Sequence, residues 1–230
     1  MRLPLATFLT VLICSCAFGQ QVQGLKFIQN KGQWNPGIDY QALVPGGRVG
    51  VSPTGFSVML LDLKELEHQH MEGHNSHINE WDGQPADEAI QGHYFRIELV
   101  GSNPDATAQV NNPLEGHYNY FLGNDNRRWA SKAKAFATVT YKDVYYKIDF
   151  RISSVWSDLK YDFIVHPGGD ASVIKIQYVG VDGIELAPDD GLEIQTSLGS
   201  LKEHRPFSYQ SDGWSSWSVF PGSPPGLLRV

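Results

Sequence analysis

Short runs of alternating apolar and polar residues make up most of the chain after residue 20. In residues 93–100, Phe95, Ile97 and Leu99 occupy odd positions, and more polar side chains occupy the even ones. A period of two predicts a strand with one buried face. Further strands are predicted, from clusters of β-branched and aromatic residues, at 49–51, 56–60, 139–141, 144–150, 160–165, 173–179, 184–186 and 192–194.

Turn sequences separate these runs at regular intervals. Ser52-Pro53-Thr54-Gly55 suits a type I turn, because proline fits the second position and glycine the last. The Asp190-Gly191 step supplies the positive φ that a tight hairpin between 184–186 and 192–194 needs. Strands that recur about every 8–12 residues are typical of an antiparallel β-sandwich or a barrel. The fold class is therefore predicted to be all-β, as an antiparallel β-sandwich.

The stretch 62–89 does not fit this pattern, because it is polar and has few apolar residues. We predict that it is a long polar loop between two β-rich blocks. The segments Leu43–Leu60 and Ile184–Leu201 each run strand, turn, strand. This similarity suggests two related β-lobes on either side of the loop.

Four of the eight histidines lie close together in this loop. Imidazole and carboxylate groups are ligands of Zn²⁺ and Cu²⁺, and glutamates alternate with these histidines. The spacing matches neither His-Glu-x-x-His nor a closed four-ligand pattern. A solvated loop is therefore the favoured interpretation, and no cofactor is predicted. The weak metal candidates are His68, His70, His74 and His77.

We expect Zn²⁺ to leave the melting temperature of residues 20–230 unchanged. Ligands on a flexible loop lose chain entropy when they converge, and no nearby residue is placed to orient their second ring nitrogens. A true site would add about 2.7 kcal/mol of stability with metal at a hundredfold its dissociation constant. The measurement is thermal melting with chelator and then with stoichiometric Zn²⁺. A rise that disappears when the four histidines are replaced by alanine would contradict this expectation.

The first nineteen residues have the pattern of a secretory signal peptide. Arg2 precedes an apolar run at 3–16, and Ala17 and Gly19 are at the −3 and −1 positions of a cleavage site. The run is shorter than the roughly 20 residues that a membrane-spanning helix needs. Acylation of Cys16 is the alternative. The protein is predicted to be exported and to be secreted or at the cell surface, with the periplasm as a further location.

Cleavage after Gly19 changes the composition in two ways. It removes both cysteines, which excludes disulfides and thiolate chemistry. It also removes Arg2, the one charged residue of the signal peptide, so the net charge of −7 becomes −8. The remaining 211 of the 230 residues can fold on their own core. An acidic domain lacks the basic surface that binding to nucleic acid or to anionic membranes requires.

Catalytic signatures are sparse in this sequence. It has no Gly-x-Ser-x-Gly motif and no phosphate-binding glycine loop. Glycoside hydrolysis needs two carboxyl groups that face each other across a cleft. The simpler interpretation of the available aspartates is solvent-facing strand positions, so no catalytic residue is predicted. The aspartates considered are Asp143, Asp149, Asp158 and Asp162.

Aromatic residues are dense between 118 and 156, where they could form a stacking platform for sugars or a partner surface. Aromatic residues on strands more often belong to the core. Most of this set is therefore predicted to be buried. Its members are Tyr118, Tyr120, Phe121, Trp129, Tyr141, Tyr145, Tyr146 and Trp156.

Three parts make up the predicted domain plan. The signal peptide spans 1–19, and the β-rich domain spans 20–210 with the polar loop at 62–89. Residues 211–230 are rich in proline and glycine and are predicted to be linker-like. This ending suggests the N-terminal part of a longer protein.

Four motifs follow one another in a recognisable order. They are FIQNKGQW at 27–34, NYFLGND at 119–125, YKDVYYKID at 141–149 and LKYDFIVHPGG at 159–169. The series resembles the N-terminal β-rich domain of unknown function of large secreted bacterial proteins. Those proteins carry SBBP-type β-propeller repeats, PKD-like modules or a gliding-motility-type (type IX) C-terminal sorting domain. The resemblance covers roughly Leu25 to Gln210.

The resemblance implies a surface or secreted location and a non-catalytic role, with no catalytic residues to transfer. The family often has Pro-Gly before Ile-Asp, where this chain has Tyr146-Lys147. The strand is therefore expected to continue through this position without a turn.

The predicted function is a non-catalytic structural or adhesive module at the cell exterior. The alternative is a carbohydrate-binding module or a glycoside hydrolase. A glycan and a cell-surface protein are the partners considered.

Overall fold

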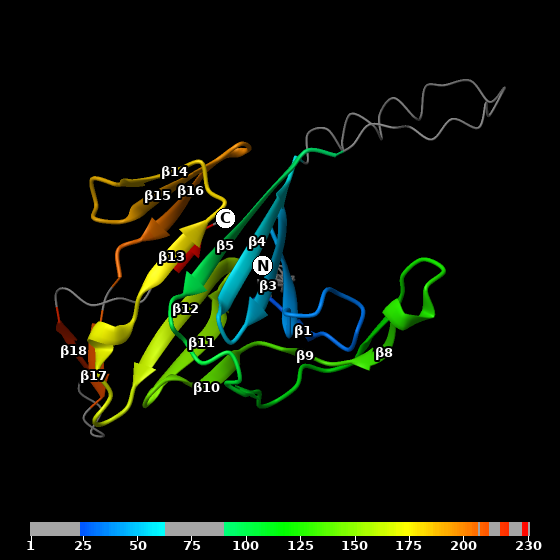
Figure 1. The fold of residues 1–230 in the computed structure, drawn as a ribbon, viewed down its shortest axis with the longest axis horizontal. Helices are drawn as coiled ribbons and strands as arrows, with labels where there is room; N and C mark the ends of the chain where they lie inside the picture. The colour runs from blue at the N-terminus through cyan, green and yellow to red at the C-terminus, as the bar shows by residue number, and fades with distance from the viewer. Residues whose placement is uncertain (1–23, 63–89, 207, 212–216, 221–226, 230) are drawn as a thin grey trace, which may run out of the picture.

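Two antiparallel sheets pack face to face around the hydrophobic core (Figure 1). The structure is a computed structural model, and it describes residues 24–62, 90–206, 208–211, 217–220 and 227–229. The prediction of an all-β antiparallel sandwich is confirmed. The short 3-10 helices of the described chain are η1 (Asn126–Arg128) and η2 (Ala171–Val173).

Sheet A has the strand order β13-β5-β4-β3-β2-β1-β9. Successive hairpins join its central strands, and the turn at 52–55 connects β3 to β4 as predicted. The strands are β1 (Phe27–Gln29), β2 (Tyr40–Val44), β3 (Gly47–Ser52), β4 (Gly55–Leu61), β5 (Gly92–Leu99), β9 (Ala135–Phe136) and β13 (Ile176–Val179).

Sheet B has the strand order β14-β15-β16-β19-β12-β11-β10-β6. Its strands are β6 (Ala108–Gln109), β10 (Val139–Tyr145), β11 (Ile148–Val155), β12 (Asp158–Val165), β14 (Gly183–Leu186), β15 (Leu192–Thr196), β16 (Gly199–His204) and β19 (Leu227–Arg229). Two further pairs are β7 (Tyr118–Phe121) with β8 (Trp129–Ala133), and β17 (Ser208–Ser211) with β18 (Trp217–Phe220).

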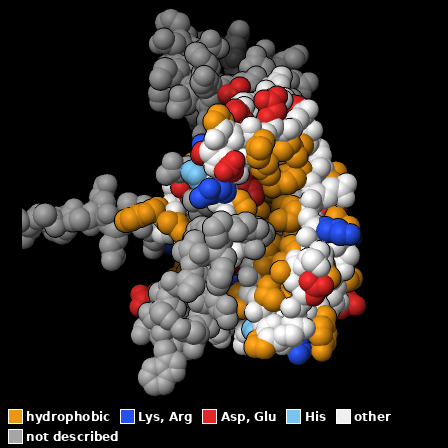
Figure 2. Space-filling model, turned by 90° about the vertical axis from the view of Figure 1, so that its left-hand side faces the viewer, with side chains coloured by type: hydrophobic (Ala, Val, Ile, Leu, Met, Phe, Trp, Pro, Cys, Tyr) orange, Lys and Arg blue, Asp and Glu red, His pale blue; other side chains and the backbone are white. Residues whose placement is uncertain are grey.

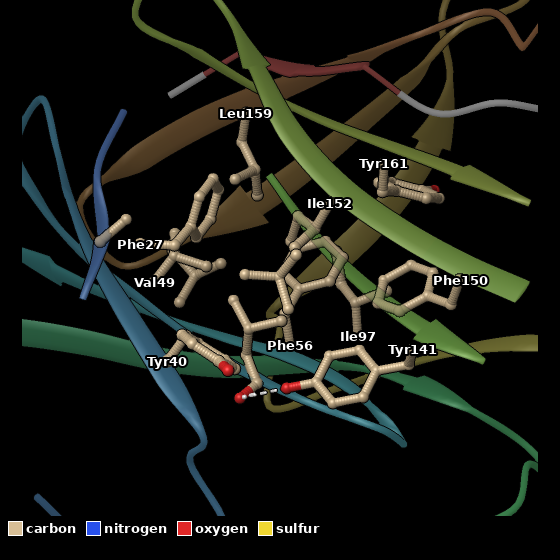
Figure 3. Close-up of a cluster of buried hydrophobic side chains, with 14 of the residues drawn as sticks. Phe27, Tyr40, Val49, Phe56, Ile97, Tyr141, Phe150, Ile152, Leu159 and Tyr161 are labelled. Carbon is tan, nitrogen blue, oxygen red and sulfur yellow. Dashed lines mark hydrogen bonds between the residues drawn. The ribbon is translucent and has the colours of Figure 1, made fainter. Parts of the chain in front are cut away.

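The core forms where the inward faces of the two sheets meet. The predicted alternation in β5 is present, because Phe95, Ile97 and Leu99 are buried and their even-numbered neighbours face outward. The Phe56 ring of sheet A lies 5.5 Å from the Tyr161 ring of sheet B, between their centroids. Figure 3 shows these side chains filling the space between the sheets. One continuous core of this kind supplies the main favourable free energy of folding.

The segment 62–89 does not separate two lobes. The strands on either side of it, β4 and β5, pair directly from Gly55 to Leu61 within one sheet. Side chains from before and after the segment belong to the same core cluster. The two-lobe prediction is therefore wrong. The order of strands along the sequence does not specify which strands pair with one another. The similar segments Leu43–Leu60 and Ile184–Leu201 belong to different sheets of one sandwich.

Two predicted strands are shorter than their patterns suggested. Tyr146-Lys147 forms a turn between the paired residues Tyr145 and Ile148, so the prediction of a continuous strand is wrong. Lys147 adopts a φ of 58°, a conformation that glycine normally supplies. The strand predicted from 173 begins at Ile176, because 171–173 forms η2 instead.

Residues 211–230, predicted to be linker-like, contain parts of the β structure. β18 pairs with β17, and β19 pairs with both β12 and β16 in sheet B. Strand pairing thus extends past residue 210. Among the described residues, no helix has the length and apolarity needed to cross a membrane.

Candidate recognition sites

A shallow groove crosses the outer face of sheet A, the face turned away from the core. The residues of its floor are small. They are Gly50 of β3, its cross-strand partner Ser57 of β4, and Gly55 at the start of β4. A Cβ atom at Gly50 would lie 2.9 Å from both the Ile38 side chain and Ser57 Oγ. Any side chain at position 50 would therefore crowd Ile38 and Ser57 and make the groove shallower.

The outward side chains of β5 line the groove on one side. Tyr94 is 50% exposed, and Arg96 Nη2 lies 2.8 Å from Glu98 Oε1 in a solvent-accessible ion pair. The loop 35–38 lines the groove as well and contributes Asn35. The groove has a volume of ≈ 310 Å³. This lies at the lower end of the range of about 300–1,000 Å³ for small-molecule sites.

This combination of side chains suits a polyhydroxylated ligand. The flat face of Tyr94 can stack on the apolar face of a sugar ring, as aromatic rings present a broad apolar surface. Arg96 supplies only donors and Glu98 only acceptors, so the pair can bind adjacent hydroxyl groups from both directions. Asn35, Ser52, Thr54 and Ser57 also line the groove, so most of its side chains are polar and can hydrogen-bond to hydroxyl groups of a ligand.

A second hollow of ≈ 500 Å³ lies beside the turn between β10 and β11. Asp143, Tyr146 and Asp170 line it. Hydrogen bonding from the Ser172 side chain, together with the bond that Ser172 N donates to the Asp170 carboxylate (2.9 Å), holds the pKa of Asp170 below its ordinary value. Asp170 is therefore the N-cap residue of η2. This hollow does not offer the pair of free carboxyl groups that glycoside hydrolysis requires.

Asp149 is a buried carboxylate that stabilises a β-bulge. Its Oδ2 accepts hydrogen bonds from Lys142 Nζ and from His166 Nε2 (2.7 Å), and its Oδ1 accepts one from Asp143 N (3.0 Å). Asp143 has a φ of 53° and lies where the register of β10 against β11 shifts. Burial raises the pKa of Asp149, but the hydrogen bonds from Lys142, His166 and Asp143 outweigh burial and hold the pKa below its ordinary value.

Asp162 is also buried, although it points away from the core. Arg151 is its direct cross-strand partner and donates to Oδ2 through Nη2 (3.0 Å) and Nε (3.2 Å). Lys160 Nζ lies 2.6 Å from Oδ1, as an ion pair without hydrogen-bond geometry. Three charged side chains on the outer face of sheet B are thus bound to one another.

The prediction that these aspartates face solvent is wrong for Asp149 and Asp162, which are buried. Asp143 is exposed and Asp158 is half-buried. Asp149 and Asp162 are each paired with cations of their own sheet, so neither is a free carboxylate across a cleft. Alternation along a strand could not reveal this, because it does not show which side chains cover the outer face.

Glu203 is a buried residue that the sequence interpretation missed. Its carboxylate accepts hydrogen bonds of 2.6 Å from Tyr161 and from Tyr178, whose hydroxyl groups come from sheets B and A respectively. Burial raises the pKa of Glu203, and the two hydrogen bonds only partly oppose this effect. Burial and the nearby carboxylate raise the pKa of both tyrosines in turn. Glu203, Tyr161 and Tyr178 therefore link sheet A to sheet B through hydrogen bonds.

The aromatic set is mostly not buried, contrary to the prediction. Tyr141 and Tyr145 belong to the core, whereas Tyr118 and Tyr120 are half-buried. The other members lie at turns and strand ends, where the core does not reach them. The exposed members are Phe121, Trp129, Tyr146 and Trp156.

Two of these exposed aromatics lie on an arm formed by β7, η1 and β8, residues 118–133. The arm stands apart from both main sheets (Figure 1). The arm contacts the loop between β1 and β2 through the Trp34 and Tyr120 rings, which meet edge to face with centroids 5.2 Å apart. At its tip, the Phe121 and Trp129 rings form a T-shaped contact at 5.7 Å and are 67% and 46% exposed. Contiguous exposed apolar surface often marks a site of interaction with a partner.

The candidates His68, His70, His74 and His77 lie outside the described residues. Within the described ranges, no group of three or more histidine, cysteine, aspartate or glutamate side chains could hold a metal ion. The groove residues Tyr94, Arg96 and Glu98 were missed as a site by the sequence interpretation. Their signal was the polar face of the predicted strand at 93–100, which carries an aromatic, a basic and an acidic residue in succession.

Comparison with protein families gives one match, to a domain of unknown function over residues 27–217. No significant match to a curated protein or to a solved structure was found. The matched range includes all four motifs of the resemblance described above. The chain therefore belongs to the family of the domain of unknown function DUF7948.

Proposed function

We propose that this protein is a non-catalytic adhesive or structural module of the cell exterior that binds carbohydrate in the groove on sheet A. The observation behind this proposal is the arrangement of Tyr94, Arg96 and Glu98 above a floor of glycine and serine. The export signal and the family resemblance support the location, and they also support a place at the N-terminal end of a longer surface protein.

The state of the buried carboxylates supports binding without catalysis. Asp149, Asp162 and Glu203 each form hydrogen bonds or ion pairs with groups on other strands, and none of the three lines either of the two hollows described above. A glycosidase would need one of two facing carboxyl groups as a free acid and the other as a base or nucleophile. Rigid strands that present a preformed groove instead suit recognition, because little ordering is required when the ligand binds.

Replacing Tyr94 with alanine is expected to weaken glycan binding about tenfold or more, since it removes the aromatic ring on which the sugar is proposed to stack. The experiment screens residues 20–230 on a glycan array and then measures the affinity for the best ligand by calorimetry. Tyr146→Ala is the matched control, because Tyr146 is 77% exposed and lies at the second hollow.

The control should bind with unchanged affinity. If Tyr146→Ala abolishes binding and Tyr94→Ala does not, the site is the second hollow and the groove proposal is wrong. Absence of binding to every glycan would also contradict it. Hydrolysis of a bound glycan would overturn the non-catalytic role and establish the alternative, a glycoside hydrolase.

A further inference from the structure

We infer that copies of this chain associate head to tail, with the arm of one copy docking on the hairpin formed by β14 and β15 of the next. The two surfaces are different parts of the molecule and have opposite charge. Neither belongs to the groove on sheet A, so this inference is independent of carbohydrate binding.

The arm is basic on an otherwise acidic chain. Residues 118–133 contain Arg127, Arg128 and Lys132 against the single acid Asp125, which gives a net charge of +2, whereas the whole chain has −7. All three basic side chains are exposed, and Arg127 also pairs with Asp125 (2.9 Å). In the sequence, Trp129 lies between Arg128 and Lys132, and Phe121 lies four residues before Asp125. The arm therefore combines an aromatic anchor with positive charge, the composition enriched at protein interfaces.

The β14–β15 hairpin has the complementary composition. Residues 182–194 contain five acids and no lysine or arginine, a net charge of −5. β14 is the edge strand of sheet B in the described chain, and Ile184 and Leu186 on it are 41% and 72% exposed. An exposed apolar edge strand is a surface that natural proteins normally cover. Lys202 and Arg205 form ion pairs with Asp189 and Asp190 in the turn of the hairpin. The acids on the strands themselves, Glu185 of β14 and Glu193 of β15, are exposed.

The positions of the two surfaces allow a chain of copies to form. Figure 1 places the arm and the β14–β15 hairpin on opposite sides of the sandwich. Figure 2 views the molecule from the hairpin side and shows hydrophobic side chains beside acidic ones in its upper part. Each copy can thus use its arm on one neighbour while its hairpin receives the arm of another. Contacts of this heterologous kind produce open assemblies unless the rotation between copies closes a ring.

A second copy fits these surfaces better than an anionic glycan or a foreign protein. An anionic glycan would explain the basic arm, but it would be repelled by the hairpin and would leave the apolar edge unexplained. A self-complementary contact uses both surfaces at once. Its electrostatic part is solvent-exposed and should weaken as salt shortens the Debye length from about 30 Å at 0.01 M to about 3 Å at 1 M.

The test is the mass of residues 20–230 as a function of protein concentration, by analytical ultracentrifugation at low and high salt. The mass should rise with concentration, should not stop at a dimer unless a ring closes, and should fall at high salt. The arm variant Phe121→Ser/Trp129→Ser and the hairpin variant Ile184→Ser/Leu186→Ser should each weaken association at least tenfold. Leu43→Ser is the control, because Leu43 is 71% exposed on β2, and this variant should associate normally.

Mixing separates the head-to-tail contact from other modes. The arm variant keeps an intact hairpin and the hairpin variant an intact arm, so an equimolar mixture should form one-to-one dimers and nothing larger. Circular dichroism and melting confirm that each variant is folded. Charge exchange gives a second readout: Arg127→Glu/Arg128→Glu should lose binding to the native hairpin and regain it with Glu185→Lys/Glu193→Lys. A monomer at all concentrations, or variants that fail to complement each other, would overturn the inference.

Discussion

Replacing Asp162 with alanine is expected to lower the free energy of unfolding by about 2–3 kcal/mol. The side chain of Asp162 is 6% exposed and neutralises Arg151 and Lys160, which are 34% and 21% exposed. Loss of one member of a buried pair costs about 3–5 kcal/mol, because the remaining charge is left without a partner. The two cations can partly turn toward water, which reduces this cost. The measurement is urea denaturation of residues 20–230 at pH 7, followed by tryptophan fluorescence.

Asp189→Ala is the matched control for this experiment. Asp189 pairs with Lys202 at 2.6 Å, but the two side chains are 50% and 46% exposed. An exposed ion pair contributes little to stability, because water screens its charges, so this variant should remain close to the native stability. Equal losses for Asp162→Ala and Asp189→Ala would mean that burial on the outer face of sheet B does not strengthen its charge network.

The sequence was sufficient to predict many of the central strands, since strand burial follows a period of two. The hairpin at 184–194 and the alternating strand at 93–100 were both found from local pattern and turn chemistry. The pairing of β4 with β5 across 62–89 was not found, because nothing local specifies the partner of a strand. The turn at Tyr146-Lys147 was missed for a related reason: Lys147 adopts a positive φ without the glycine or asparagine that would signal it.

The candidate site was harder to predict than the fold. The polar residues of β5 were identified as an outward face, but a groove exists only because small residues of two other strands lie beside them. Buried carboxylates presented the same difficulty. Glu203 is followed by His204 in a short alternating strand, and only the structure shows that hydroxyl groups from two sheets meet its carboxylate.

Glu203 is expected to make the stability of the native protein depend on pH in a specific direction. Its pKa in the folded state is raised above the ordinary value of 4.5, chiefly by burial. A group with a raised pKa binds its proton more tightly in the folded state than in the unfolded state. Its contribution to stability is therefore full below the unfolded pKa and is lost as the pH rises through the folded pKa. Above that folded pKa Glu203 is ionised, and no cation among the described residues pairs with its carboxylate, so its contribution to stability is less favourable at high pH than at low pH.

Glu203→Gln should remove this dependence. Its stability relative to the native protein should increase from pH 4.5 upward and level off once Glu203 is fully ionised in the native protein, with a gain on the order of 1 kcal/mol at pH 8. Asp149 has the opposite dependence, because its lowered pKa makes its contribution disappear as the pH falls. Asp149 is present in both proteins, so its effect cancels in the difference.

Tyr178→Phe should show the reverse of the Gln variant. It removes one of the two hydroxyl groups that stabilise the ionised carboxylate, so it should cost about 1.5–3 kcal/mol at pH 8 and less at pH 5, where Glu203 is more often protonated. Tyr145→Phe is the control, because the Tyr145 hydroxyl donates to a neutral acceptor, the carbonyl of Val100 (3.1 Å). Its cost should be the same at both pH values. Urea denaturation of the four proteins from pH 5 to pH 8 measures all three differences. Parallel pH profiles for the native protein and Glu203→Gln would mean that the pKa of Glu203 is the same in the folded and unfolded states, which would contradict the prediction.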